Sequence, residues 1–192
     1  SSLCDHHLSY MNAGKTNTTD NLLLEVCMAA KHEGESLQGY YDRYRVKNTD
    51  FNTTICTVLA RSFADIGDIV RGKDLFIGNN KRDKLEKQLQ KYFNNIYENL
   101  EGAAKACYNG DKDNNFFKLR EDWWEANRET VWKAITCGAH GTYFHATCSD
   151  LNESPSMARD KCRCTKTSGG KPGKSETDQV PTYFDYVPQF LR

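Results

Sequence analysis

The sequence predicts an all-α protein, a helical bundle of about four main helices with long, disulfide-containing loops. Apolar residues recur at the spacing of an amphipathic helix in several long segments, and no segment shows the sustained alternation of a half-buried strand. The chain of 192 residues is long enough for one real core, and its 11% of aromatic residues argues against disorder.

The first helical segment begins after Asp20, whose side chain is suited to cap a helix. We expect this helix to end at Gly34 and a short second helix to follow. The apolar stripe of the first helix comprises Leu22, Leu23, Val26, Cys27 and Ala30. The short helix carries Leu37, Tyr40, Tyr41 and Tyr44.

The strongest helical pattern lies between Asp50 and Gly72. Its apolar positions form one face of a long helix, and Gly72 is a suitable stop. We expect a kink at Gly67, because glycine inside a helix costs about 1 kcal/mol. The apolar positions are Phe51, Ile55, Val58, Leu59, Phe63, Ile66, Ile69 and Val70.

Two further helices are predicted from capping residues and periodicity. Asn79 or Asn80 is expected to cap the third, which ends near Gly102, and Asn114 or Asn115 the fourth, which ends before Gly138. The third directs inward Leu85, Leu89, Phe93, Ile96, Tyr97 and Leu100. The fourth carries Phe116, Leu119, Trp123, Trp124, Val131, Trp132 and Ile135.

The three tryptophans of the fourth helix allow two interpretations. An exposed aromatic platform would bind a ligand, whereas aromatic residues at helical spacing usually belong to the core. We favour the core for most of the set, because Trp124, Val131 and Ile135 share one face. Trp123 and Trp124 point about 100° apart, so we expect one of them to be partly exposed.

Eight cysteines favour an extracellular protein over a reduced cytosolic one. No segment resembles a signal peptide or approaches the roughly 20 apolar residues of a membrane span, so a targeting segment and an anchor are expected outside this chain. The net charge of zero excludes general attraction to nucleic acid. The cysteines are Cys4, Cys27, Cys56, Cys107, Cys137, Cys148, Cys162 and Cys164.

No motif in the sequence supports catalysis or a cofactor. His145, Cys148, Cys162 and Cys164 have the chemistry of zinc ligands, but disulfides explain the three cysteines without a metal. The Gly173-Lys174-Ser175 run lacks the earlier glycine and the preceding strand of a phosphate-binding loop. We therefore predict a protein that is not an enzyme and needs no metal or cofactor.

Two basic clusters are the candidate binding residues. Within the first, Lys84, Lys87 and Lys91 repeat at positions that share one face of the third helix. Either cluster has the charge to hold a sulfated glycan, and either is equally explained as a solvated surface, since Asp83 and Glu86 dilute the first. The first cluster comprises Lys81, Arg82, Lys84, Lys87 and Lys91, and the second Lys161, Arg163, Lys166, Lys171 and Lys174.

Composition divides the chain into four parts. Residues 20–164 hold the helical segments and residues 165–179 have the composition of a flexible linker. Apolar residues return in 180–192, which is interpreted as the start of a further packed unit, and residues 1–19 as the tail of a preceding one.

Four blocks of sequence resemble the Duffy-binding-like domains, in the form of the alpha class of the Plasmodium falciparum erythrocyte membrane adhesins. They are ARSFADIGDIVRG at 60–72, LFIG at 75–78, LREDWW with VWKAITC at 119–137, and VPTYFDYVPQFLR at 180–192. Their order and spacing also match. The resemblance implies the end of a first subdomain, a complete helical second subdomain and the start of a third.

The resemblance further implies a cysteine pairing and a function. It pairs Cys56 with Cys162 or Cys164, and Cys137 with Cys148 would close the loop between them; Cys27 and Cys107 remain candidates. It implies a host-receptor-binding adhesin fragment at the extracellular face of the infected red cell membrane. The implied partners are sulfated glycosaminoglycan, blood-group sugar or a red-cell surface protein, together with adjacent subdomains of the same adhesin. The alternative is a structural spacer whose neighbours carry the receptor site.

Overall fold

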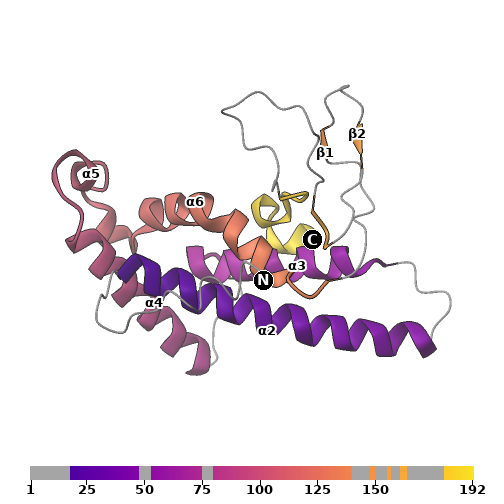
Figure 1. Cartoon of the computed structure of the whole chain (residues 1–192). Helices are drawn as coiled ribbons and strands as arrows, with labels where there is room; N and C mark the ends of the chain where they lie inside the picture. Colours follow the sequence, from indigo (N-terminus) through magenta and orange to yellow (C-terminus); the bar gives the residue numbers. More distant parts are fainter. Residues whose placement is uncertain are drawn as a thin grey trace.

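The computed structural model describes residues 18–47, 53–74, 80–139, 148–149, 155–156, 161–163 and 180–192. Four long helices dominate these residues, so the predicted all-α fold is confirmed (Figure 1). They are α2 (Thr18–Lys47), α3 (Ile55–Arg71), α4 (Asn80–Glu98) and α6 (Phe117–Ile135). The boundaries proposed between the bundle, the linker and the flanking units remain predictions.

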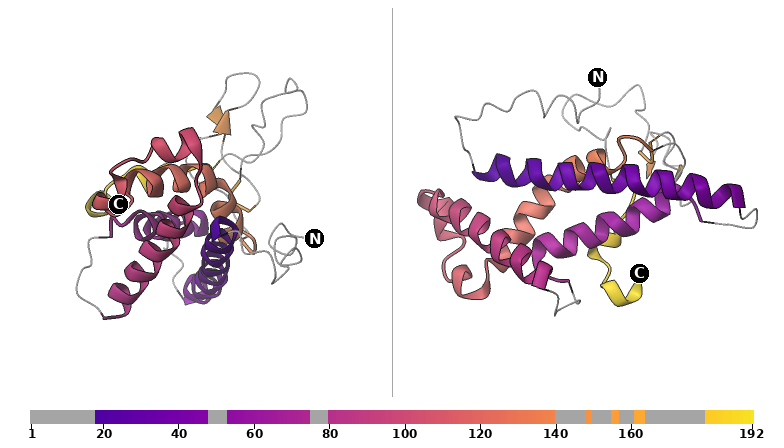
Figure 2. Two further views of the ribbon diagram at one scale, coloured as in Figure 1. Left: turned by 90° about the vertical axis from the view of Figure 1, so that its left-hand side faces the viewer. Right: turned by 90° about the horizontal axis from the view of Figure 1, so that it is seen from below.

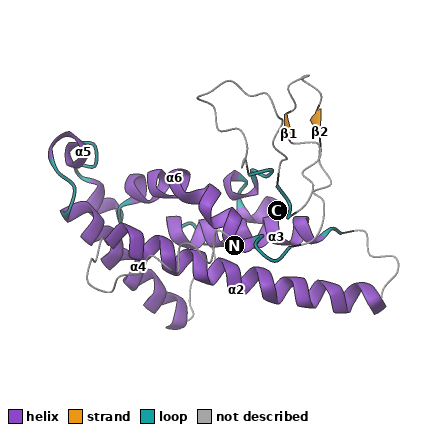
Figure 3. Cartoon of the chain, in the orientation of Figure 1, coloured by secondary structure: helices purple, strands orange, loops and turns teal. Residues whose placement is uncertain are grey.

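Short elements complete the described chain (Figure 3). Helix α5 (Gly102–Ala106) and the 3-10 turn η1 (Asp111–Asn114) link α4 to α6. Strands β1 (Cys148–Ser149) and β2 (Pro155–Ser156) form one short antiparallel pair. Turns η2 (Phe184–Tyr186) and η3 (Gln189–Leu191) end the chain, with η2 packed against α3.

Helix α2 is one continuous helix, so the predicted stop at Gly34 is wrong. The glycine allows close packing there: a Cβ atom at this position would lie 2.0 Å from the carbonyl oxygen of Ile135 at the end of α6. Figure 2 shows α2 running beside α3, with its C-terminal end extending beyond α3. A glycine that the local pattern assigned to a helix end therefore serves a helix–helix contact.

Helix α3 has the predicted C-terminal end and a later start. Thr54 caps it, since the Thr57 amide donates to the Thr54 hydroxyl at 3.3 Å. Gly72 ends it in the left-handed conformation, with φ 71°. Gly67 lies inside this continuous helix, where an added Cβ would meet the Trp124 ring at 2.7 Å. Gly67 thus admits a tryptophan, and the predicted kink is not needed to explain it.

Helix α6 is capped by a residue that the periodicity did not indicate. The carboxylate of Asp111 accepts hydrogen bonds from the amides of Lys118 at 3.0 Å and Leu119 at 2.9 Å. The expected capping residues Asn114 and Asn115 instead belong to the turn before the helix, where Asn115 has φ 55°. The carboxylate is brought back by η1, which no helical pattern predicts.

All three tryptophans are buried, so the expectation that Trp123 or Trp124 is partly exposed is wrong. Trp123 is 5% exposed and meets Phe93 of α4 edge-on, with the ring centroids 6.1 Å apart. Trp124 and Trp132 both pack against Phe63 of α3. Because α6 packs against α2, α3 and α4, more than one of its faces is covered, and both tryptophan directions lead into protein.

Candidate functional site

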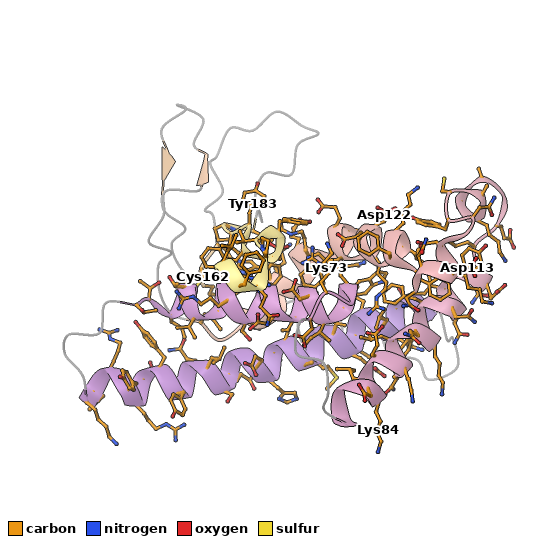
Figure 4. All side chains as sticks on the ribbon, turned by 180° about the vertical axis from the view of Figure 1, so that it is seen from behind. Lys73, Lys84, Asp113, Asp122, Cys162 and Tyr183 are labelled. Atoms are coloured by element: carbon orange, nitrogen blue, oxygen red, sulfur yellow. A yellow bond between two sulfur atoms is a disulfide. The ribbon has the colours of Figure 1, made fainter. Side chains whose placement is uncertain are left out.

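Three lysines of the first basic cluster, Lys84, Lys87 and Lys91, lie on the outer face of α4. Leu89 and Phe93 direct the inner face into the core, which leaves Lys84, Lys87 and Lys91 exposed. Figure 4 shows the side chain of Lys84 extending from α4 away from the other helices. Within the described part of the chain, none of the three lysines forms an ion pair. We call these three residues the lysine row.

Glu86, the acidic residue between Lys84 and Lys87, forms an ion pair with Arg120. Glu86 accepts hydrogen bonds from both terminal nitrogens of Arg120, at 2.7 and 3.0 Å. The Arg120 side chain is 2% exposed and also donates to the Val70 carbonyl at 2.7 Å, so it is fixed in place. Because Arg120 balances Glu86, the charge that dilutes the lysine row is reduced to that of Asp83.

Lys81 and Arg82 belong to the first turn of α4, but their side chains lie outside the described residues. Their predicted part in binding remains a prediction. Leu85, which follows them, is 43% exposed at the end of an apolar hollow between α2, α3 and α4.

The second basic cluster does not behave as one exposed surface. Arg163 is half-buried and donates to the Thr136 hydroxyl at 3.2 Å and to the Lys133 carbonyl at 2.8 Å. Its charge therefore stabilises the C-terminal end of α6, and its part in ligand binding remains a prediction. Lys161 is half-buried in the preceding turn. The other members, Lys166, Lys171 and Lys174, lie outside the described residues.

A disulfide joins Cys56 to Cys162, one of the two pairings that the family resemblance implied. The bond spans 106 residues of sequence, with the Cα atoms 5.5 Å apart. It ties the first turn of α3 to the segment that carries Arg163, and the Cys162 carbonyl accepts a hydrogen bond from Trp132 at 3.1 Å. Figure 4 labels Cys162 beside α3.

The other disulfide candidates differ in their surroundings. Cys107 is an exposed free thiol, so for this residue the expected pairing is wrong within the described part of the chain. It lies in the turn after α5, where the chain faces solvent. Cys27 and Cys137 are half-buried. Cys164 and the side chain of Cys148 lie outside the described residues, so a bond from Cys137 to Cys148 stays a prediction.

The C-terminal segment is held by a buried ion pair that sequence reasoning missed. Arg128 of α6 binds both carboxylate oxygens of Asp185, at 2.7 and 2.8 Å. The Asp185 side chain has no exposed surface, and the Trp124 indole donates to it at 2.9 Å. The rings of Tyr183 and Tyr186 cover the guanidinium. No helical spacing relates residues 57 positions apart, so only packing reveals the pair.

A second set of charges joins the last residue to α3. Arg192 donates to Asp65 at 2.9 Å and pairs with Asp68, which also pairs with Arg71 at 3.2 Å. Burial raises the pKa of Asp65 and of Asp68, and the nearby Arg192 offsets only part of this effect. The arginines therefore favour the charged form of these two carboxylates, against the effect of burial.

The described residues include no group of three histidine, cysteine or acidic side chains that could hold a metal. His145 and Cys164, which entered the zinc interpretation, lie outside those residues. No described helix is long and apolar enough to cross a membrane. Exposed cations on the helices are therefore the candidate binding groups among the described residues.

A family model of the Duffy binding domain matches residues 1–192. Among solved structures, the NTS-DBL1(alpha-1) domain of PfEMP1 from the varO strain of Plasmodium falciparum is 41% identical, with a TM-score of 0.68. The alignment covers 98% of this chain and 39% of that chain. The NTS-DBL1-alpha and CIDR-gamma double domain from the same strain is 40% identical, with a TM-score of 0.68, covering 93% and 24%.

An ICAM-1-binding DBLbeta domain of PfEMP1 is also similar, with 33% identity, a TM-score of 0.57 and coverage of 90% of this chain and 34% of that one. The chain therefore spans well under half the length of these structures. The comparison with curated proteins gave no match. The family match over all residues and the 41% identity show that this chain belongs to the Duffy binding domain family, the adhesion domains of the PfEMP1 adhesins.

Proposed function

We propose that this chain binds a host receptor as part of an adhesin on the surface of the infected red cell, and that its ligand is an acidic glycan held by the lysine row of α4. The observation that carries the proposal is the row itself: three exposed ammonium groups on one helix face, with the intervening Glu86 balanced by Arg120.

The geometry of the row suits a linear anionic chain. Positions 84, 87 and 91 lie on one side of a helix and span about 10 Å, given a rise of about 1.5 Å per residue. A sulfated sugar chain lying along α4 would meet the three ammonium groups in turn. Lysine presents a point charge on a flexible stem, which tolerates irregular sulfate spacing.

The strength of such binding depends on several weak contacts together. Each exposed ion pair contributes roughly 0.2–1 kcal/mol, so one lysine is insufficient. Binding should weaken with added salt, because the Debye length falls to about 8 Å near physiological ionic strength. Lys81 and Arg82 would extend the row at its N-terminal end.

The related domains support a receptor-binding role without naming this chain's receptor. The DBLbeta relatives bind ICAM-1, a host surface protein. A heparan-sulfate-like chain is the glycan that best fits the lysine row; a blood-group sugar or a red-cell surface protein would need other contacts. Adjacent subdomains of the same adhesin are the remaining partners. The chain then acts in cytoadhesion and rosetting at the extracellular face of the infected red cell membrane.

A heparin column tests the proposal on the full-length adhesin. Replacing Lys84, Lys87 and Lys91 together by glutamate is expected to lower affinity by roughly tenfold or more and to lower the eluting salt concentration. The helical circular dichroism spectrum should not change, because the three side chains face solvent.

A matched variant with the same change in net charge serves as the control. Lys105, Lys112 and Lys118, near α5 and the start of α6, are replaced by glutamate. If both variants elute at the same reduced salt concentration, binding depends on net charge and not on the row. If the row variant elutes like the wild type, the lysine row is a solvated surface and the heparin site lies in the second basic cluster or in neighbouring subdomains.

A further inference from the structure

A second exposed surface, on the C-terminal half of α2, combines aromatic rings with cations. Tyr40 is 68% exposed and Tyr44 is 43% exposed. Tyr41 alone of the three tyrosines turns inward, where its hydroxyl donates to the Thr53 carbonyl at 2.9 Å. The continuous course of α2 thus divides the tyrosines between two faces.

Residues 40, 43, 44 and 47 share the outer face, because positions three, four and seven apart lie on one side of a helix. This face carries Tyr40, Arg43, Tyr44 and Lys47, all exposed. Figures 1 and 2 show this end of α2 extending past α3, at the opposite end of the molecule from α4. We call these four residues the α2 tip.

Local contacts hold the arginine of the α2 tip in a defined position. The Arg43 guanidinium lies 5.7 Å from the centre of the Tyr40 ring, and its Nε donates to the Gly39 carbonyl at 2.9 Å. Among the described residues no carboxylate pairs with Arg43. Its two terminal nitrogens are therefore available to an anion beside an exposed ring.

The composition of the α2 tip exceeds what helix stability requires. Basic residues in the last turn offset the partial negative charge at a helix C-terminus, and Arg45 and Lys47 fill that role. Arg43 and the two exposed tyrosines contribute little to that effect. Solubility does not require them either, since exposed tyrosine rings add apolar surface.

The geometry points to the α2 tip as a second binding site for an acidic sugar chain, distinct from the lysine row. This inference rests on the proposed function, from which it takes the ligand class. The α2 tip carries two cations, Arg43 and Lys47, and no acidic residue, which provides charge complementarity to sulfate or carboxylate groups. The tyrosine rings supply flat apolar faces for the sugar ring and lose little conformational freedom on binding.

The two sites differ in what they recognise. The lysine row offers charge alone, so its binding should fall steeply with salt. The α2 tip adds ring stacking, so part of its affinity should persist at a salt concentration that releases the ligand from the lysine row. The end of α2 and helix α4 lie at opposite ends of the molecule, so one molecule can hold two glycan chains, which raises avidity on a receptor-coated surface.

The test compares two arginines on one turn of α2 in the full-length adhesin, with heparin oligosaccharides of defined length as the probe. Arg43→Glu removes a cation of the α2 tip, and Arg45→Glu makes the same charge change on the side that carries Tyr41. In the background of the Lys84, Lys87 and Lys91 glutamate variant, we expect Arg43→Glu to lower the remaining affinity between about threefold and tenfold. Arg45→Glu should change it by less than about twofold.

The aromatic contribution is tested separately at Tyr40. Tyr40→Ala should lower the affinity at high salt about threefold or more, whereas Tyr40→Phe, which keeps the ring, should not. Equal effects of Arg43→Glu and Arg45→Glu, or no effect of Tyr40→Ala, would overturn the α2 tip as a site and leave the lysine row standing. Absence of heparin binding in the wild type would instead overturn the proposed function first.

Discussion

The arginines of the interior bind acidic side chains, whereas the lysine row of α4 faces solvent, although both sets of residues carry the same positive charge. Arg71, Arg120, Arg128 and Arg192 are all nearly enclosed and each binds a carboxylate and a backbone carbonyl. The lysine row has no such partner among the described residues. Charge counted along the sequence does not distinguish these two roles.

The chemistry of the two side chains explains the division. The planar guanidinium has five donors and satisfies a carboxylate and a carbonyl at once, so its burial is compensated. The ammonium group of lysine is more strongly hydrated and is best left in water. A binding site built from solvent-facing cations is therefore sought among lysines, and arginines enter it only where packing leaves them outside, as at Arg43.

The largest expected effect comes from breaking the interior pair. Arg128→Ala should lower the free energy of unfolding by about 3–5 kcal/mol, because it leaves Asp185 buried without a counter-ion. Chemical denaturation measures the change. Replacing Arg128 by methionine and Asp185 by leucine together should recover most of the loss. A loss below about 1 kcal/mol for the single variant would mean that the interior arginines are not structural.

A smaller effect on stability is expected from substituting two glycines of α2, Gly34 in its packed half and Gly39 in its exposed half. Gly34→Ala places a methyl group against the Ile135 carbonyl and should cost about 1–3 kcal/mol. Gly39→Ala, in the same helix, meets nothing within 4 Å and should stabilise by about 0.5–1 kcal/mol. Equal melting temperatures for the two variants would contradict this division of α2.

A matched pair of basic residues sharpens the comparison further. Arg163→Ala should cost about 1–2 kcal/mol, because it removes the hydrogen bonds to Thr136 and Lys133. Lys87→Ala, which removes an exposed cation, should change stability by less than about 0.5 kcal/mol. Thermal unfolding of both variants would show whether the second basic cluster is structural at Arg163. A larger loss of stability for Lys87→Ala than for Arg163→Ala would instead favour a binding role for Arg163.

The smallest expected effect is a loss of stability at alkaline pH that involves Tyr108, near the N-terminal end of α6. Burial, together with the hydrogen bond to Asp122, raises the pKa of Tyr108 from 10.0 to about 12. The folded state therefore holds this proton more tightly than the unfolded state. The resulting stabilisation is fully present below pH 10 and is lost as the pH rises from 10 towards 12. Tyr108→Phe should remove that part of the pH dependence in urea unfolding measured across this range.

Local pattern predicted much of the fold. The stripe from Ile55 to Val70 indicated α3, and Gly72 its end, because capping and amphipathic spacing depend on residues a few positions apart. The periodic pattern did not reveal the packing role of Gly34 or the capping role of Asp111, because both residues contact parts of the chain outside their own element. The lysine row was visible as a spacing, but the neutralisation of Glu86 was not.

The sequence by itself determined the helical fold through its periodicity and the family through the order of its motifs. The resemblance to that family then implied the two alternatives for the Cys56 disulfide. Only the tertiary structure decided that Cys162 is the partner of Cys56, that Arg163 donates to the Lys133 carbonyl and that Tyr40 faces solvent. These outcomes depend on residues far apart in the chain, such as Arg128 and Asp185, meeting in a dense core. Packing therefore decides which charged side chains form ion pairs inside the protein and which remain exposed to bind a ligand.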